Sequence, residues 1–305
     1  NAVAQKYIIP TNRTIGRFHP SKTPAETVFI SHTKDLAGLV DNYKGKEAMS
    51  TGESFDVGYD AIEKRLDRGN LPNGITYGLI EKNNRGNTVT LNLSIRNGDS
   101  KSLTNKGMLP SLTASMLNKG TKSKTRQQIE DELSKLKSSI SFGARNGNVY
   151  ASVNSTEENL LPSLALMADM LKNPSFEAAE LEKIKTAMLA SLENIKTDPQ
   201  YLASYRLRVI NNHFPKGHPL YTMTLEEQAD AIKNTTIQDI SSFYNEFYGL
   251  GKSILVGIGT LKADEVKSLF EKDFKDFQSK EPYVRLADPY TPNKDVHEDI
   301  QTPDK

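Results

Sequence analysis

The segment TVTLNLSIRNG at residues 88–98 constrains the fold more than any other stretch of this sequence. Its apolar residues alternate strictly with polar ones, and they are Val89, Leu91, Leu93 and Ile95. Because successive side chains of a β-strand point to opposite faces, this alternation predicts a strand with one buried and one solvated face. Such a half-buried strand is typical of an antiparallel sheet that is covered on one side.

Similar patterns predict the other elements of one domain. Further strands are expected at 75–82, 139–145, 148–155 and 253–260, and the last is apolar enough to lie in the middle of a sheet. Helices are expected within 107–121, 125–139, 155–172, 178–196, 199–211, 225–232, 236–247 and 262–276. Capping boxes are expected at Thr125–Gln128, Ser155–Glu158 and Thr235–Gln238. The order of elements predicts the α+β class, with a mainly antiparallel β-sheet packed against helices.

The sequence outside residues 71–280 has the composition of connecting segments. Residues 1–20 hold two short β-prone runs, and because a lone hairpin is marginal in water we expect them to complete a sheet elsewhere. Residues 21–70 lack a sustained period, apart from a helical pattern at 34–43, and are expected to be a linker that drapes over a surface. The extended segment 281–305 is expected to be a second linker. We therefore expect the chain to be a piece of a longer protein.

The composition excludes several classes of function. Lys and Arg number 39 and Asp and Glu number 38, so the net charge of +1 favours neither nucleic acid nor an anionic membrane as a partner. The absence of cysteine excludes disulfides, thiolate zinc sites and cysteine nucleophiles. No apolar run approaches the length of a transmembrane helix. We expect a bacterial protein that is periplasmic or otherwise exported, with a cytoplasmic location as the alternative.

The histidines do not form a known metal-binding motif. They are His19, His32, His213, His218 and His297. His213 and His218 lie five residues apart in a loop and could converge on a metal with further ligands, but we interpret them as loop residues in polar contacts.

Other candidate motifs have simple structural explanations. The GIGT segment at 257–260 lacks the remainder of a phosphate-binding loop and predicts a tight turn between a strand and a helix. The basic run at 119–126 is expected to be a solvated loop that the acidic residues 130–132 balance. The segment ELEKIK at 180–185 is expected to be an exposed helix face rather than a pair of catalytic carboxylates, because Glu180 and Glu182 do not share a side of the helix.

The segment GMLPSLTASMLNKGT at residues 107–121 predicts a short helix with one apolar stripe and a stop signal. Its other face carries only small groups, because Ser111, Ala114 and Ser115 share one stripe at spacings of three and four.

The order of elements and the short sequence segments within them resemble the pitrilysin/insulinase family, the HxxEH zinc peptidases that include the mitochondrial processing peptidases. The matching segments cover about 71–280 and include LPNGITYGLIEK, LSIRNGDSKS, KGMLPSLTASMLNKGT, IEDELSKLKSSISF, LALMADMLKNPSF, HPLY and ILVGIGT. The resemblance implies an α+β metallopeptidase-like domain. YIIPTNRTIGRFHP resembles the closing segment of a preceding domain, and IQTPDK resembles the entry to a following one.

The resemblance also shows where this chain departs from the catalytic pattern. In the register set by Gly120–Thr121, the two motif histidines correspond to Ser111 and Ser115, and the general-base glutamate corresponds to Ala114. A register set by Gly107 gives instead Pro110, Thr113 and Ala114. Neither register contains a histidine or a glutamate.

The later zinc ligand of the family is missing as well. By the match to LEKIKTAMLASL, this glutamate corresponds to Ser191, and an accessory acid corresponds to Ile184. Catalytic zinc needs three protein ligands and a polarised water, which serine hydroxyls and a methyl group cannot provide. We expect no catalytic residue, metal ligand or cofactor in this segment, and Zn²⁺ in the catalytic domain of the parent protein.

Two functions remain open for a domain of this kind. The resemblance implies a non-catalytic segment of a zinc metalloendopeptidase that forms part of a chamber wall and supports substrate binding and closure. Its partners would be a homologous catalytic domain, in the same chain or another subunit, and a peptide substrate. The alternative is a catalytically inactive structural, assembly or protein-binding module derived from the same fold.

Overall fold

The computed structural model describes residues 2–7, 9, 12–14, 16, 51–145, 147–292, 295–300 and 302, and it divides into two compact units, residues 1–48 and 49–305. In the first unit, Ala2–Tyr7 form helix α1, so the β conformation expected at the start of the chain is wrong for these residues. The helical pattern at 34–43 and the histidines His19 and His32 lie outside the described residues.

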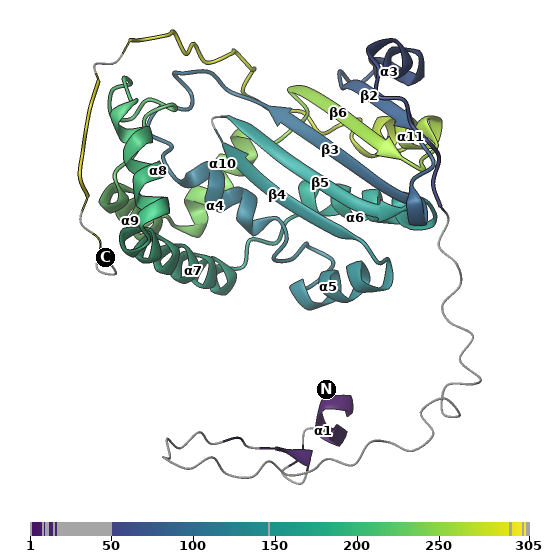
Figure 1. Ribbon diagram of the computed structural model, residues 1–305, viewed down its shortest axis with the longest axis horizontal. Coiled ribbons are helices and arrows are strands. Elements are labelled where there is room, and N and C mark those ends of the chain that lie inside the picture. The colour runs from purple at the N-terminus through teal and green to yellow at the C-terminus, as the bar shows by residue number, and fades with distance from the viewer. Residues whose placement is uncertain are drawn as a thin grey trace, which may run out of the picture. The chain divides into compact units, whose positions relative to one another are not determined.

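The second unit is built on a six-stranded mixed sheet (Figure 1). Its strands are β1 Leu66–Asn70, β2 Thr76–Glu81, β3 Thr88–Arg96, β4 Ser139–Arg145, β5 Asn148–Thr156 and β6 Lys252–Gly259. The order across the sheet is β1-β2-β6-β3-β5-β4, and only the β2–β6 pair is parallel among these strands. The prediction of a mainly antiparallel sheet is confirmed, and so is the central position of β6, the strand expected at 253–260.

Helices connect and cover the strands of this unit. They are α3 Tyr59–Arg65, α4 Leu109–Met116, α5 Arg126–Lys135, α6 Leu160–Lys172, α7 Ala178–Thr197, α8 Pro199–Ile210, α9 Leu225–Asn234, α10 Ile237–Phe247 and α11 Ala263–Asp273. Short 3-10 helices occur at Arg85–Asn87 and Glu157–Asn159. The α+β class predicted from the sequence is therefore confirmed, with each predicted helix from 107 to 276 present near its expected place.

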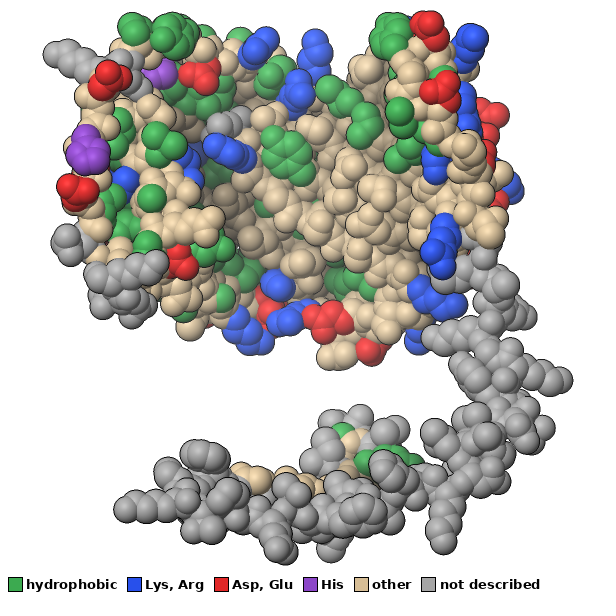
Figure 2. Space-filling view, viewed as in Figure 1, with side chains coloured by type: hydrophobic (Ala, Val, Ile, Leu, Met, Phe, Trp, Pro, Cys, Tyr) green, Lys and Arg blue, Asp and Glu red, His purple; other side chains and the backbone are tan. Residues whose placement is uncertain are grey.

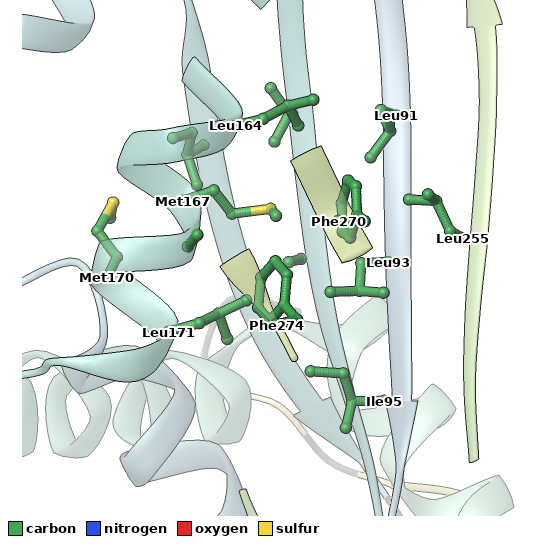
Figure 3. Close-up of a cluster of buried hydrophobic side chains, with 14 of the residues drawn as sticks. Leu91, Leu93, Ile95, Leu164, Met167, Met170, Leu171, Leu255, Phe270 and Phe274 are labelled. Atoms are coloured by element: carbon green, nitrogen blue, oxygen red, sulfur yellow. The ribbon is translucent and has the colours of Figure 1, made fainter. Parts of the chain in front are cut away.

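The main core lies between the sheet and helices α6 and α11. Figure 3 shows Leu164, Met167 and Leu171 of α6 and Phe270 and Phe274 of α11 directed at the apolar side chains of β3 and β6. The alternating residues of β3 are all at most 1% exposed, and they are Val89, Leu91, Leu93 and Ile95. Burying a side chain of this size stabilises the folded state by about 1.5–3 kcal/mol, so the alternation selects which face of the sheet is covered.

The opposite face of the sheet is largely uncharged. Figure 1 shows α6 and α11 behind the sheet and no helix in front of its centre. On β3 this face carries Thr90, whose hydroxyl donates a 2.9 Å hydrogen bond to Asn154 Oδ1 on β5. Figure 2 shows that polar uncharged side chains and backbone dominate the middle of this face, while charged groups gather at its margins.

Two of the three predicted capping boxes need correction. The box of Thr125 and Gln128 is confirmed at the start of α5. Ser155 is not a cap, because it lies within β5, where its buried hydroxyl lies 2.8 Å from Ser138 Oγ. At α10 the box is formed by Thr236 and Asp239, because the Thr235 hydroxyl already donates to the Ala231 carbonyl at the end of α9.

The predicted boundaries of the domain also change. Residues 66–70 were expected in the linker but form β1, which pairs with β2 through Leu66↔Ile80 to Asn70↔Thr76. The sequence LDRGN has no apolar alternation, so this edge strand depends on its partner for its structure. Residues 281–292 contain no helix or strand, as expected, but Val284 N donates a 3.0 Å hydrogen bond to the Gly98 carbonyl. That the flanking segments act as linkers stays a prediction.

Candidate functional site

Helix α4 lies against β4, α7 and α10, and its apolar stripe forms a small core there. Leu112 and Met116 are fully buried and pack with Leu181, Ile184 and Ile240 from the two neighbouring helices. Pro110 stands in the first turn, where its missing amide hydrogen costs no helical hydrogen bond. The short apolar helix predicted from the sequence is thus confirmed, and α7 and α10 hold its position.

The stripe of small residues on α4 is packed rather than free. Ala114 is only 1% exposed. The Ser111 hydroxyl donates to the Ala144 carbonyl of β4 at 3.3 Å, and the Ser115 hydroxyl donates to the Ser111 carbonyl at 2.9 Å. These contacts give both hydroxyls a partner and leave no ionisable group on this stripe.

The structure does not bring the remaining motif positions together as a polar site. Ser191 is exposed on α7, whereas Ile184 is buried in the core beside Leu112. In the alternative register, Thr113 is fully buried and its hydroxyl donates to the Leu109 carbonyl at 2.8 Å. The side chain of Pro110 has no atom that can bind a metal. Neither register therefore supplies a metal ligand set.

A cleft of about 770 Å³ opens at the first turn of α4. The start of this helix and Ser111 form one side, the β4–β5 end with Ala144, Arg145 and Gly147 a second, and the loop 211–224 with α9 a third. This volume lies within the range of pockets that hold small molecules. Of the motif positions named above, Pro110 and Ser111 line the cleft.

The walls of the cleft come from loops that are joined by backbone contacts. Asn105 N donates a 2.8 Å hydrogen bond to the Gly217 carbonyl. Gly217 has φ +90°, a left-handed conformation that favours glycine, and a Cβ there would meet Asn105 Oδ1, so the Asn105 side chain would have to move. The sequence showed a loop here but not which second loop it contacts.

A hydrogen-bonded acidic residue lies on the α9 side of the cleft. Glu227 receives hydrogen bonds from Thr224 N at 2.9 Å and Tyr221 OH at 3.1 Å, and it forms a 2.7 Å ion pair with Lys216. The bond from Lys216 and then that from Thr224 hold the pKa of Glu227 below its ordinary value. Burial raises the pKa of the nearby Tyr205, whose oxygen accepts a hydrogen bond from Leu225 N.

His213 and His218 are engaged in the loop rather than directed at a common point. The ring of Phe214 stacks on His218 at 4.5 Å and packs against His213 at 4.3 Å between centroids. Nδ1 of His218 accepts a 3.1 Å hydrogen bond from Leu220 N. The interpretation of these histidines as residues in polar contacts agrees with this arrangement.

The other candidate motifs have the structural roles that the sequence favoured, with one exception. Gly259 pairs with Val89 and has φ +142°, and a Cβ there would overlap the Thr88 carbonyl. The GIGT segment is therefore the end of a strand that lies in close contact with the backbone of β3. In the basic run, Lys124 pairs with Glu132 at 3.2 Å. The segment 180–185 is not wholly exposed, because Leu181, Ile184 and Lys185 are buried against α4 and α9.

Among the described residues, no three His, Asp or Glu side chains come together as a group able to hold a metal ion. No described helix has both the length and the apolar character needed to cross a membrane.

Comparisons with known proteins agree on one family. Residues 78–223 match the insulinase family, peptidase family M16. The chain is 27% identical over 175 residues to the non-peptidase homolog YmxG of Helicobacter pylori, covering 57% of this chain and 40% of that protein. It is 23% identical over 205 residues to the mitochondrial-processing peptidase subunit beta of Caenorhabditis elegans, covering 67% and 43%.

A solved structure shows the same fold. The crystal structure of a peptidase M16 inactive domain from Pseudomonas fluorescens superposes with a TM-score of 0.64 at 23% identity, covering 74% of this chain and 54% of that one. The chain spans about half the length of the relatives it matches.

Proposed function

Because this chain belongs to the insulinase family (peptidase family M16), we propose that it forms a non-catalytic part of a zinc metalloendopeptidase. Catalysis then takes place in a homologous domain of the same chain or of a partner subunit. The length of the relatives supports this division, since each has room for a second unit of similar size.

The chemistry of helix α4 is the observation that carries the proposal. Hydrolysis by a bound zinc ion requires ligands with lone pairs of sufficient basicity and a group that accepts a proton from water. On α4 the corresponding atoms are two serine hydroxyls that donate to carbonyls and one methyl group that is 1% exposed. The residues present therefore do not fit a catalytic zinc ion.

We further propose that the domain forms part of the wall of a peptide-binding chamber. The cleft beside α4 supports this role, because it combines apolar side chains such as Met108 and Met223 with polar groups along its sides. A peptide held there would be presented to the catalytic centre of the partner domain.

The non-catalytic role is tested by zinc content and peptide hydrolysis. The chain is loaded with equimolar zinc, passed through a desalting column and analysed for bound metal, and its cleavage of quenched fluorescent peptides is measured with and without a chelator. We expect no stoichiometric zinc and no chelator-sensitive cleavage. One retained zinc per chain together with such cleavage would contradict the proposal.

The assembly module is the second candidate, and the name of the Helicobacter pylori relative, a non-peptidase homolog, favours it. The sequence of the homologous half or subunit separates the two functions. If the homologous half or subunit contains an HxxEH motif, this supports a role for the chain as part of a peptidase. Peptide cleavage by that partner should then rise when this chain is added. A partner without that motif would leave the assembly function.

A further inference from the structure

We propose that the cleft beside α4 binds a carboxylate group of a peptide through Arg145 and Arg208. Arg145 is the last residue of β4, and Arg208 lies in the last turn of α8, so two separate elements bring positive charge to one cleft. The inference rests on the peptide-binding part of the proposed function and adds the chemical class of the peptide.

The balance of charge in the cleft indicates an anionic ligand. Its charged lining residues are Lys106, Arg145, Arg208, Lys216, Glu227 and Asp239. Lys106 pairs with Glu246 at 3.6 Å, Lys216 pairs with Glu227 at 2.7 Å, and Asp239 accepts hydrogen bonds from Thr236 at the start of α10.

The two arginines differ from these paired groups. Within residues 51–145 and 147–292, neither the Arg145 nor the Arg208 guanidinium makes an ion pair or a side-chain hydrogen bond, and both side chains are exposed. The cleft thus keeps an excess of positive charge that no neighbouring group neutralises. A guanidinium binds a carboxylate through two parallel hydrogen bonds, which gives direction as well as attraction.

The remainder of the cleft favours a peptide as the carrier of that carboxylate. Met108, Leu109, Leu220 and Met223 line it with apolar surface, and Gln228 and Asn234 add neutral polar groups. A nucleic acid is a poor match, because the cleft also contains two carboxylates and the whole chain has a net charge of only +1. Apolar contact together with one or two anionic contacts suits a short peptide with a glutamate, an aspartate or a free C-terminus.

The experiment measures binding of fluorescent hexapeptides to the chain by anisotropy at low ionic strength. One amidated peptide carries Glu, a second carries Gln in its place, and a third carries Lys. A fourth has the Gln sequence with a free C-terminal carboxylate. The variants are Arg145→Gln and Arg208→Gln, and the matched control is Arg206→Gln. Arg206 lies on the same helix as Arg208 but pairs with Glu298 at 2.8 Å and does not line the cleft.

We expect at least one carboxylate peptide to bind about tenfold more tightly than the amidated Gln peptide. Arg145→Gln and Arg208→Gln should each remove most of that difference, and Arg206→Gln should retain it. The Glu peptide and the free C-terminus distinguish a side-chain carboxylate from a terminal one. Added salt should weaken the selective part of the binding.

Other results would overturn the inference. Equal binding of the Glu, Gln and Lys peptides would remove the carboxylate preference and leave the peptide-binding role in place. An equal loss in Arg206→Gln would assign the effect to general surface charge. Absence of binding by every peptide would contradict both the inference and the peptide-binding role, while the non-catalytic role is tested separately by zinc and cleavage.

Discussion

Asn105 N and the Gly217 carbonyl are joined by a 2.8 Å hydrogen bond, and this contact connects the loop before α4 to the loop after α8. The two residues are 112 positions apart in the sequence, so the wall of the cleft depends on a long-range contact.

Gly217→Ala should destabilise the fold and disturb the cleft. The residue has φ +90°, which strains a residue other than glycine, and the added Cβ would also displace the Asn105 amide oxygen. We expect a loss of about 1–3 kcal/mol in the free energy of unfolding, measured in urea. Gly143→Ala is the matched control, because a Cβ at Gly143 meets no atom within 4 Å and its φ is not positive. Equal stability of the two variants would show that the loop contact is unimportant.

Ala114→Glu should not create a general base but should destabilise the domain. Ala114 is 1% exposed, so a carboxylate at this site would lose its hydration. We expect a loss of about 3 kcal/mol or more and no gain of peptidase activity. The control is Ala203→Glu on the exposed side of α8, where little change is expected. A variant as stable as the parent would mean that this face of α4 is open rather than packed.

Leu112→Ala tests the small core that positions α4. Leu112 is fully buried against Leu181, Ile184 and Ile240, so its truncation leaves a cavity. We expect a loss of about 2–5 kcal/mol in the free energy of unfolding. Leu207→Ala on α8 should cost little, because Leu207 is 59% exposed. Similar losses in both variants would contradict the packing described for α4.

Glu227→Gln should reduce stability in a manner that depends on pH. The pKa of Glu227 in the folded state is held below its ordinary value, first by the hydrogen bond from Lys216 and then by that from Thr224. A depressed folded-state pKa contributes stability above the ordinary pKa, and this contribution is lost as the pH falls through the folded-state value. Glutamine can still accept the bond from Thr224 N but carries no charge.

The difference between Glu227→Gln and the parent should therefore be largest near neutral pH and shrink below the ordinary pKa of a glutamate, about 4.3. Urea unfolding at a series of pH values measures it. Glu226→Gln serves as the control, because Glu226 is exposed on the same turn and forms no ion pair among the described residues. A difference that is constant with pH would exclude the charge of Glu227 as its source.

Much of the fold could be established from local patterns. The alternation in β3, the apolar stripe of α4 and the capping box of Thr125 depend on residues close in sequence, and each was found where the pattern predicted it. Two predicted capping boxes were wrong because the side chains form other hydrogen bonds with nearby residues. Ser155 pairs in β5 instead of capping a helix, and Thr235 bonds back to Ala231 so that Thr236 caps α10. Strand β1 was missed because an edge strand carries little apolar signal.

The absence of histidine and glutamate at Ser111, Ala114, Ser115 and Ser191 needs no structure, because the side-chain chemistry follows from residue identity alone. The packing of Ala114, the hydrogen bonds of the serines and the exposure of Ser191 depend on how α4 meets β4 and α7. The cleft and its unpaired arginines depend on packing in the same way. Whether a charge such as that of Arg145 or Arg208 is neutralised is set by distances between elements far apart in the sequence, and those distances exist only in the folded chain.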